Sequence, residues 1–258
     1  MNNSIFVHRK EMLNKLSLHI ENYEFEYGFN ILHELDLSIA NFYYIKKVID
    51  DLTKNESNSN FQFSIYLFSV KKRQDLVNKY FPKIHINLLS GNFFIMKNHE
   101  YHQSIKLDVN TDDYGDRKTW GSYYESATSN PDRFAWKLDL VKSVSTNEKS
   151  YFRIVNKAYS QSIKLDVNTD DYGDRQTWGS YYESATSNPD RFYWEIKLSF
   201  DYSDDLLDSR IMVVNKAYSQ SIKLDINTDD YGDRQTWGGY YKNDSSNLDR
   251  FYWSFELF

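Results

Sequence analysis

The chain has 258 residues, of which 40% are hydrophobic and 26% are charged, and its net charge is −6 at pH 7 with a pI near 5.5. A mean hydropathy of −0.71 argues against insertion into a membrane, the acidity argues against a nucleic-acid partner, and an aromatic content of 17% is too high for a disordered chain. Cysteine is absent, so disulfides, thiol catalysis and cysteine-bound metals are excluded.

The first residues, MNNSIFVHRKEML, contain no long apolar segment of the kind found in secretory signals. This composition predicts a cytoplasmic protein, or one that is released without a classical signal peptide.

Residues 1–92 contain no Trp and are nearly neutral, with 11 Lys and Arg against 10 Asp and Glu. Apolar spacing predicts, in chain order, a strand at Leu16–Tyr27, a helix at Leu37–Thr53 with Asp36 as N-cap, a strand at Asn60–Ser69, a helix at Lys71–Phe81 ended by Pro82, and a strand at Lys83–Ser90. We therefore expect a small α+β domain. It shows no catalytic motif, its histidines lack metal-ligand spacing, and a protein partner is the role left open for it.

Residues 93–258 contain one unit three times. Tyr101–Trp136, Tyr159–Trp194 and Tyr218–Trp253 align without a gap at offsets of 58 and 59 residues, and they hold all six Trp. Of their 36 positions, 3 differ between the first and second copies and 7 between the second and third. The region is acidic, with 20 Lys and Arg against 27 Asp and Glu. The predicted units are 93–150, 151–209 and 210–258.

Each unit shows four strand-like segments. In the first unit they are Phe93–Asn98, Ser104–Val109, Thr119–Tyr124 and Phe134–Val141, where apolar and polar residues alternate. The polar stretch Asn110–Arg117 (NTDDYGDR) is typical of a hairpin turn. Three units of four strands predict a mainly β domain, and closing them around a threefold axis would leave no unpaired sheet edge.

This pattern resembles a β-trefoil of the ricin-B lectin type over Phe93–Phe258. Leu107-Asp108-Val109 is similar to that family's second strand, Trp120 stands where the family often places a sugar-stacking aromatic residue, and Phe134-Ala135-Trp136 occupies the place of its Q-x-W motif. Two departures are that Phe replaces the Gln and that Arg133 replaces the preceding sugar-binding Asn. A weaker resemblance, carried by Asp108, Asn110 and Tyr114, is to the β-prism mannose-binding lectins.

The trefoil resemblance implies a non-enzymatic, carbohydrate-binding, lectin-like protein with up to three equivalent sites and with glycans or glycoconjugates as partners. In such sites a carboxylate accepts hydrogen bonds from adjacent sugar hydroxyls and an indole or phenol stacks on the ring. The implied sugar-binding residues are Asp108, Trp120, Tyr124, Asn130 and Arg133, then Asp166, Trp178, Tyr182, Asn188 and Arg191, then Asp225, Trp237, Tyr241, Asn247 and Arg250.

Structural roles compete with these assignments. The Asp side chains would then bond to turn amides, the Arg side chains would order their loops, and Trp136, Trp194 and Trp253 are predicted core residues. No cofactor or metal is predicted, because the glycine of NTDDYGDR falls at the wrong position for a calcium-binding EF-hand loop. The alternative function is a protein–protein binder or inhibitor of the immunity-protein type.

Overall fold

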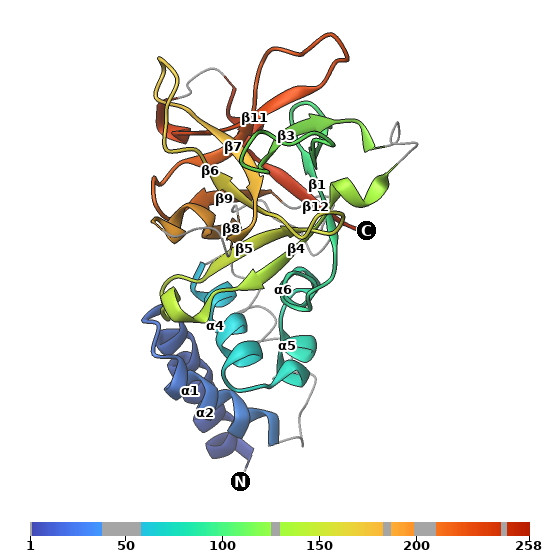
Figure 1. The fold of residues 1–258 in the computed structure, drawn as a ribbon. Coiled ribbons are helices and arrows are strands. Elements are labelled where there is room, and N and C mark those ends of the chain that lie inside the picture. The colour runs from blue at the N-terminus through green and yellow to red at the C-terminus, as the bar shows by residue number, and fades with distance from the viewer. Residues whose placement is uncertain (1, 38–57, 125–129, 183–186, 199–209, 244–246) are drawn as a thin grey trace. The chain divides into compact units, whose positions relative to one another are not determined.

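The computed structural model describes residues 2–37, 58–124, 130–182, 187–198, 210–243 and 247–258. The chain divides into two compact units. The first unit comprises Met1–Ser90 and the short segment Ser145–Ser150, and the second comprises Gly91–Val144 and Tyr151–Phe258. The coiled ribbons in blue and cyan in Figure 1 belong to the first unit, and the arrows from green to red belong to the second.

The described part of the first unit is helical. Its helices are α1 (Asn2–Glu21), α2 (Phe25–Leu37), α4 (Asn58–Ser69), α5 (Gln74–Tyr80) and α6 (Lys83–Leu89). Their core contains Leu16, Phe25, Leu32, Phe63 and Leu67, each at most 2% exposed. The loop segment Ser145–Ser150 joins this unit through Ser150, whose Oγ donates to Oε1 of Gln62 at 2.6 Å.

The α+β prediction for residues 1–92 is wrong, because the three predicted strands are helices. Leu16–Tyr27 falls on the end of α1 and the start of α2, Asn60–Ser69 lies in α4, and Lys83–Ser90 forms α6. In α4 even the polar residues are buried, and Oγ of Ser64 donates to the carbonyl of Phe61 at 2.7 Å. A helix buried on all sides loses its one-sided apolar stripe, so alternation along its sequence says nothing about strand structure.

Two helix predictions had different outcomes. The helix at Lys71–Phe81 is confirmed as α5, which ends directly before Phe81. The helix predicted at Leu37–Thr53 falls almost wholly on residues 38–57, which lie outside the described residues. Its expected N-cap, Asp36, belongs to the last turn of α2, and its carboxylate accepts hydrogen bonds from Lys79 and Tyr80.

The second unit is mainly antiparallel β, with four strands per repeat close to the predicted positions. The strands are β1 (Phe94–Asn98), β2 (Ser104–Leu107), β3 (Arg117–Ser122), β4 (Ala135–Leu140), β5 (Tyr151–Asn156), β6 (Ser162–Leu165), β7 (Arg175–Ser180), β8 (Trp194–Leu198), β9 (Ile211–Asn215), β10 (Ser221–Leu224), β11 (Arg234–Gly239) and β12 (Trp253–Leu257). Short 3-10 helices precede the last strand of each repeat: η3 (Pro131–Phe134), η6 (Pro189–Phe192) and η8 (Leu248–Phe251).

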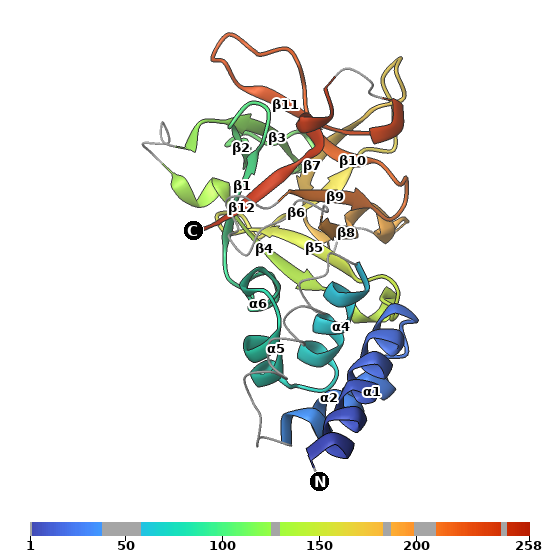
Figure 2. The same ribbon diagram turned by 180° about the vertical axis from the view of Figure 1, so that it is seen from behind.

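The strands pair in two sets. The first and last strands of the repeats form a closed ring in the order β1, β4, β5, β8, β9, β12 and back to β1. Figure 2 shows β12, in red, beside β1, in green, where the ring closes. The middle strands form three hairpins, β2–β3, β6–β7 and β10–β11. Strands β3, β7 and β11 also pair with one another, so each repeat pairs with both of the others.

The last strand of each repeat carries one core tryptophan near its start. Trp136, Trp194 and Trp253 are at most 1% exposed, which confirms their prediction as core residues. Their indole N–H groups donate to the carbonyls of Ile105, Ile163 and Ile222 at 2.8, 2.8 and 3.0 Å, which ties each ring strand to its own hairpin.

The three hairpins meet at a buried cluster of threonines. Thr119, Thr177 and Thr236 are at most 1% exposed, and their hydroxyl oxygens contact one another. Each hydroxyl also donates to the main-chain carbonyl of the next threonine in the cycle, at 2.8–2.9 Å. These contacts satisfy the buried hydroxyls and mark the axis about which the repeats are arranged.

Candidate functional site

The NTDDYGDR turns are closed by their own hydrogen bonds. In the first repeat, Oδ1 of Asp112 accepts from the amides of Tyr114 and Asp116 at 2.9 and 2.8 Å. Gly115 has φ +81°, a left-handed conformation that favours glycine. The second and third turns repeat this geometry at Asp170 and Asp229. The predicted hairpin turn is therefore confirmed.

Each turn also docks on the following repeat. The carboxylate of Asp116 pairs with Lys164, and the carbonyl of Gly115 accepts a hydrogen bond from Gln161 at 2.8 Å. The remaining two boundaries carry the matching contacts: Asp174 with Lys223 at 2.7 Å, Gly173 with Gln220 at 2.7 Å, Asp233 with Lys106 at 2.5 Å, and Gly232 with Gln103 at 2.7 Å. The contacts run in a cycle around the three repeats, which gives the identical turns a structural role.

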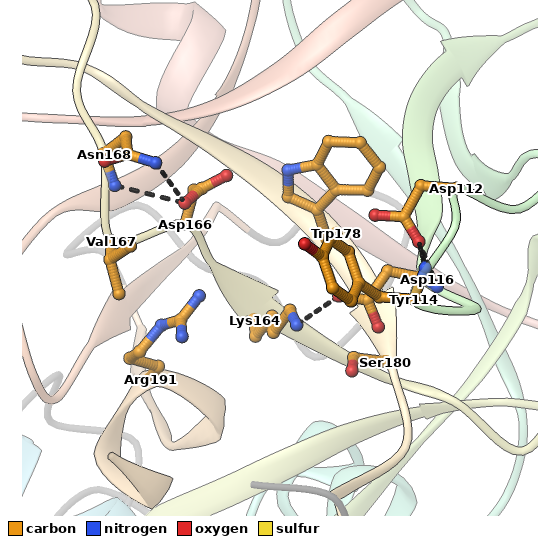
Figure 3. Close-up of a pocket in the computed structure, with 10 residues that line it drawn as sticks. All are labelled: Asp112, Tyr114, Asp116, Lys164, Asp166, Val167, Asn168, Trp178, Ser180 and Arg191. Carbon is orange, nitrogen blue, oxygen red and sulfur yellow. Dashed lines mark hydrogen bonds and ion pairs between the residues drawn. The ribbon is translucent and has the colours of Figure 1, made fainter. Parts of the chain in front are cut away.

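An open pocket of about 580 Å³ lies at the boundary between the first turn and the second repeat (Figure 3). The turn supplies Asp112, Tyr114 and Asp116, and the second repeat supplies Lys164, Asp166, Val167, Asn168, Trp178, Ser180 and Arg191. The volume falls within the roughly 300–1,000 Å³ of typical small-molecule sites. Three of the predicted site residues, Asp166, Trp178 and Arg191, are brought together here.

The predicted Asp residues all have a structural role at the start of their turns. Oδ1 of Asp166 accepts from the amide of Asn168 at 3.1 Å, and Asp108 and Asp225 make the same bond two residues ahead. This is the turn-amide contact expected from their structural alternative. Among the described residues, the structure gives the second oxygen of Asp166 no hydrogen-bond donor.

The indole nitrogens differ among the repeats. Nε1 of Trp120 donates to Oδ2 of Asp108 at 3.2 Å. The corresponding nitrogens of Trp178 and Trp237 are buried and have no hydrogen-bond partner in the described part of the chain. The pocket at the second repeat is therefore bordered by an N–H group and a carboxylate oxygen that are not bonded to each other.

The predicted Arg residues are held by the main chain. Nε of Arg133, Arg191 and Arg250 donates to the carbonyls of Leu107, Leu165 and Leu224 at 2.7, 2.6 and 2.8 Å. In Figure 3 the rest of the Arg191 guanidinium faces the pocket. The side chain thus serves an anchoring role through one nitrogen and remains available through the others.

The predicted Tyr residues lie elsewhere. Tyr124, Tyr182 and Tyr241 pack edge-on against Phe134, Phe192 and Phe251 with ring centroids 5.5–5.6 Å apart. The hydroxyl of Tyr182 also bonds to that of Tyr193, and burial, followed by this hydrogen bond, raises the pKa of Tyr193 to about 12. These contacts give the rings a packing role outside the pocket.

The predicted Asn residues do not border the pocket either. Asn130, Asn188 and Asn247 each directly precede a 3-10 helix, and their side chains make no capping hydrogen bond in the described structure.

Sequence reasoning missed Tyr114, Asp112 and Lys164. The signal for the two turn residues was the identity of NTDDYGDR in all three repeats. It was interpreted as a hairpin turn, and Tyr114 was noted only in the weaker resemblance to β-prism lectins. The signal for Lys164 was its outward position in the alternating SIKL strand, where a partner from another repeat could meet it.

Two further properties concern only the described residues. No group of three or more His, Cys, Asp or Glu side chains there could hold a metal ion. None of the helices there has the length and apolar character needed to cross a membrane.

The fold is that of a two-unit chain, one unit helical and the other a repeat-built antiparallel β structure with an open pocket. Residues 11–257 match the lepidopteran low molecular weight (30 kD) lipoprotein family, and the chain belongs to that family. Microvitellogenin of Manduca sexta is 30% identical over 83% of this chain and 80% of its own length. The low molecular mass lipoprotein PBMHP-12 of Bombyx mori is 24% identical over 75% of this chain and 69% of its own length.

Solved structures resemble the chain only remotely. The SDF2-like protein from Arabidopsis thaliana is 8% identical with a TM-score of 0.49, and the match covers 64% of this chain and 92% of that one. A Macrolepiota procera ricin B-like lectin in complex with lactose is 9% identical with a TM-score of 0.40, over 65% and 94% of the two chains. Likenesses at this level carry no argument about this protein.

The family corrects three predictions. The lectin function and the glycan partners are wrong, because the relatives are lipoproteins. The cytoplasmic location is wrong as well, because the family and these relatives are insect lipoproteins. The resemblance to ricin-B lectins rested on repeat architecture and on Asp and Trp placement, and the substitution of Arg133, Arg191 and Arg250 for the sugar-binding Asn was the sign against it.

Proposed function

We propose that this chain is a non-enzymatic storage protein that associates with lipid, as the names of its family and relatives suggest. We also propose that residues 93–258 form a β-trefoil of three repeats, 93–150, 151–209 and 210–258. The closed ring of six strands and the triangle formed by β3, β7 and β11 support this fold. Residues 1–92 are proposed as a separate domain, for which a protein partner is one candidate role.

The observation that carries the lipid proposal is a repeated set of exposed apolar side chains at the turns. Tyr114, Tyr172 and Tyr231 are 90–91% exposed, and Val109, Val167 and Ile226 are 55–60% exposed. Single exposed apolar residues need no explanation, but here the same pair recurs in each repeat. Tyr combines an apolar ring with a polar hydroxyl, and this combination suits a boundary between lipid and water.

The exposed Tyr and aliphatic pair occupies the same place in each of the three hairpins. Leu107 pairs with Thr119 across the first hairpin, so the turn begins one residue beyond the buried threonine cluster. The other two hairpins have the same register at Leu165 with Thr177 and at Leu224 with Thr236. All three turns therefore begin beside the same axis, and each presents one exposed Tyr and one exposed aliphatic side chain to a lipid surface.

The charge of the region selects the kind of surface. Residues 93–258 hold 27 Asp and Glu against 20 Lys and Arg, and each turn carries three Asp. An anionic lipid surface would repel these turns, so we expect association with zwitterionic or neutral lipid.

Flotation of the full chain with phosphatidylcholine vesicles tests the proposal. We expect the protein to float with the vesicles, and we expect the triple variant Tyr114→Ser, Tyr172→Ser, Tyr231→Ser to float several-fold less. The matched control replaces Tyr123, Tyr181 and Tyr240, which are 43–51% exposed at the far end of the same strands. Failure of the parent protein to float, or an equal loss in the control, would contradict the proposal.

A further inference from the structure

We infer that the pocket between the first turn and the second repeat binds a phosphocholine group. The inference deepens the proposed lipid association, on which it rests for the natural source of the group. A zwitterion of this kind offers a quaternary ammonium at one end and a phosphate at the other, and the pocket presents a complement to each.

The cationic end is matched by aromatic rings and carboxylates. Figure 3 shows the ring of Tyr114 and the indole of Trp178 on the same side of the pocket, with Asp166 to the left of the indole and Asp112 to its right. A quaternary ammonium has no N–H to donate, so it is bound by aromatic faces and by negative charge rather than by hydrogen bonds. Tyr114 is 91% exposed, so its ring is available for such a contact.

The carboxylates keep part of their capacity. Among the described residues, Asp112 accepts hydrogen bonds through Oδ1 alone, and so does Asp166. Asp116 is different, because its side chain is 16% exposed and paired with Lys164. That pair is internally neutral, and the charges lining the pocket that remain for a ligand are those of Asp112, Asp166 and Arg191. Lys118, which does not line the pocket, places its Nζ 5.8 Å from the centroid of the Trp178 ring.

The anionic end is matched by Arg191. Its Nε is fixed on the carbonyl of Leu165 at 2.6 Å, which orients the planar guanidinium while its other nitrogens face the pocket. A guanidinium recognises phosphate through paired N–H groups, and here it is already held in place by the main chain.

The mixture of charges favours a zwitterion over simple ions. Inorganic phosphate would meet two carboxylates, and choline alone would leave the guanidinium without a partner. Val167, 55% exposed and lining the pocket, offers an apolar contact for the part of a lipid beyond its phosphate.

Calorimetric titration of the full chain with free phosphocholine tests the inference. We expect saturable binding, with phosphoethanolamine and inorganic phosphate each about tenfold weaker or more, because they lack the quaternary ammonium. Tyr114→Ser and Asp166→Asn should each weaken phosphocholine binding about tenfold. Tyr123→Ser is the control, since Tyr123 is 51% exposed outside the pocket, and its affinity should equal that of the parent.

Two outcomes would contradict the inference. No saturable phosphocholine signal, or equal affinity for phosphoethanolamine, overturns the inference. Circular dichroism of Tyr114→Ser checks that a loss of binding does not come from a loss of fold. We expect the fold to be kept, because this side chain is exposed.

A vesicle arm separates this inference from the proposed function. Binding of free phosphocholine together with flotation on phosphatidylcholine, but not on phosphatidylglycerol, supports a lipid headgroup as the source. Binding of free phosphocholine without flotation supports the pocket and contradicts lipid association. Equal flotation on both kinds of vesicle without phosphocholine binding supports lipid association and overturns the pocket.

Discussion

At the scale of single residues, the threonine cluster on the axis is the most constrained part of the β unit. Replacing Thr177 by Val keeps the shape of the side chain but removes a hydroxyl that contacts Thr119 and donates to the carbonyl of Thr236. Buried polar groups then lose a partner, and we expect a loss of about 1–3 kcal/mol in the free energy of unfolding. Urea denaturation measures this loss. The exposed Thr111→Val should change stability by less than about 0.5 kcal/mol, and equal effects would contradict the assigned role.

A second prediction at this scale concerns acid. His85 lies fully buried in the helical unit between Phe61 and Phe81, and burial lowers its pKa to about 3. The unfolded chain takes up this proton near pH 6.5, so the contribution of the neutral ring is complete above that pH. It is lost as the pH falls toward 3, by up to about 1.4 kcal/mol per pH unit.

The check is a series of denaturation curves between pH 7 and pH 3.5. The variant His85→Leu should lose stability less steeply than the parent over this range, whereas His8→Leu, at an exposed position, should follow the parent. Parallel curves for the parent and His85→Leu would show that the ring is not kept neutral by burial.

Predictions for single residues were confirmed where the sequence of one repeat was sufficient to define the environment of the side chain. Trp136 could be assigned to the core because it shares one face of its strand with the apolar Phe134 and Leu138. Asp166 could be placed at the start of a turn because the polar residues that follow it in its own repeat are typical of a turn. Tyr114 could not be placed in a pocket, because the other side of that pocket comes from a different repeat. Spacing along the chain does not reveal which repeat lies next to this turn.

At the scale of elements, the NTDDYGDR turns connect the repeats. Asp116→Asn removes the charged partner of Lys164, and both side chains are 14–16% exposed. Because a charge-assisted hydrogen bond in a partly buried place is lost, we expect destabilisation of about 1–3 kcal/mol. Asp113→Asn makes the same change of charge at an exposed position of the same turn and should stay within about 0.5 kcal/mol of the parent. Thermal unfolding distinguishes the two, and equal midpoints would argue against docking of the turn.

Strand and helix prediction fared differently in the two units for a physical reason. In the repeats, strands such as β9 alternate between buried and partly exposed residues, so alternation in the sequence reports the structure directly. In α4, nine of the twelve residues are buried, and the polar Ser64 and Ser69 satisfy their hydroxyls on carbonyls of their own helix. Alternation there was accidental, and the helix was mistaken for a strand.

At the scale of the whole molecule, the threefold repetition and the mainly β character of residues 93–258 follow from the sequence alone. The contacts that join the repeats do not. Gly179 illustrates this, because a Cβ there would lie 2.5 Å from the side chain of Leu107 in another repeat. The sequence around Gly179 does not predict this contact. Gly121 and Gly238 face Leu224 and Leu165 in the same way, so the close approach of the hairpins requires glycine at all three places.

The proposed lipid association likewise rests on observations at this scale. The lectin prediction was drawn from single residues at positions resembling a known site, whereas the family and the repeated exposed Tyr residues point toward lipid. The most direct measurement is lipid extraction. The full chain is incubated with vesicles of mixed phospholipids, recovered by size exclusion, extracted with solvent and analysed by mass spectrometry. The account predicts recovered phospholipid enriched in choline headgroups, and lower recovery after Tyr114→Ser, Tyr172→Ser and Tyr231→Ser are combined. Recovery of protein free of lipid would contradict it.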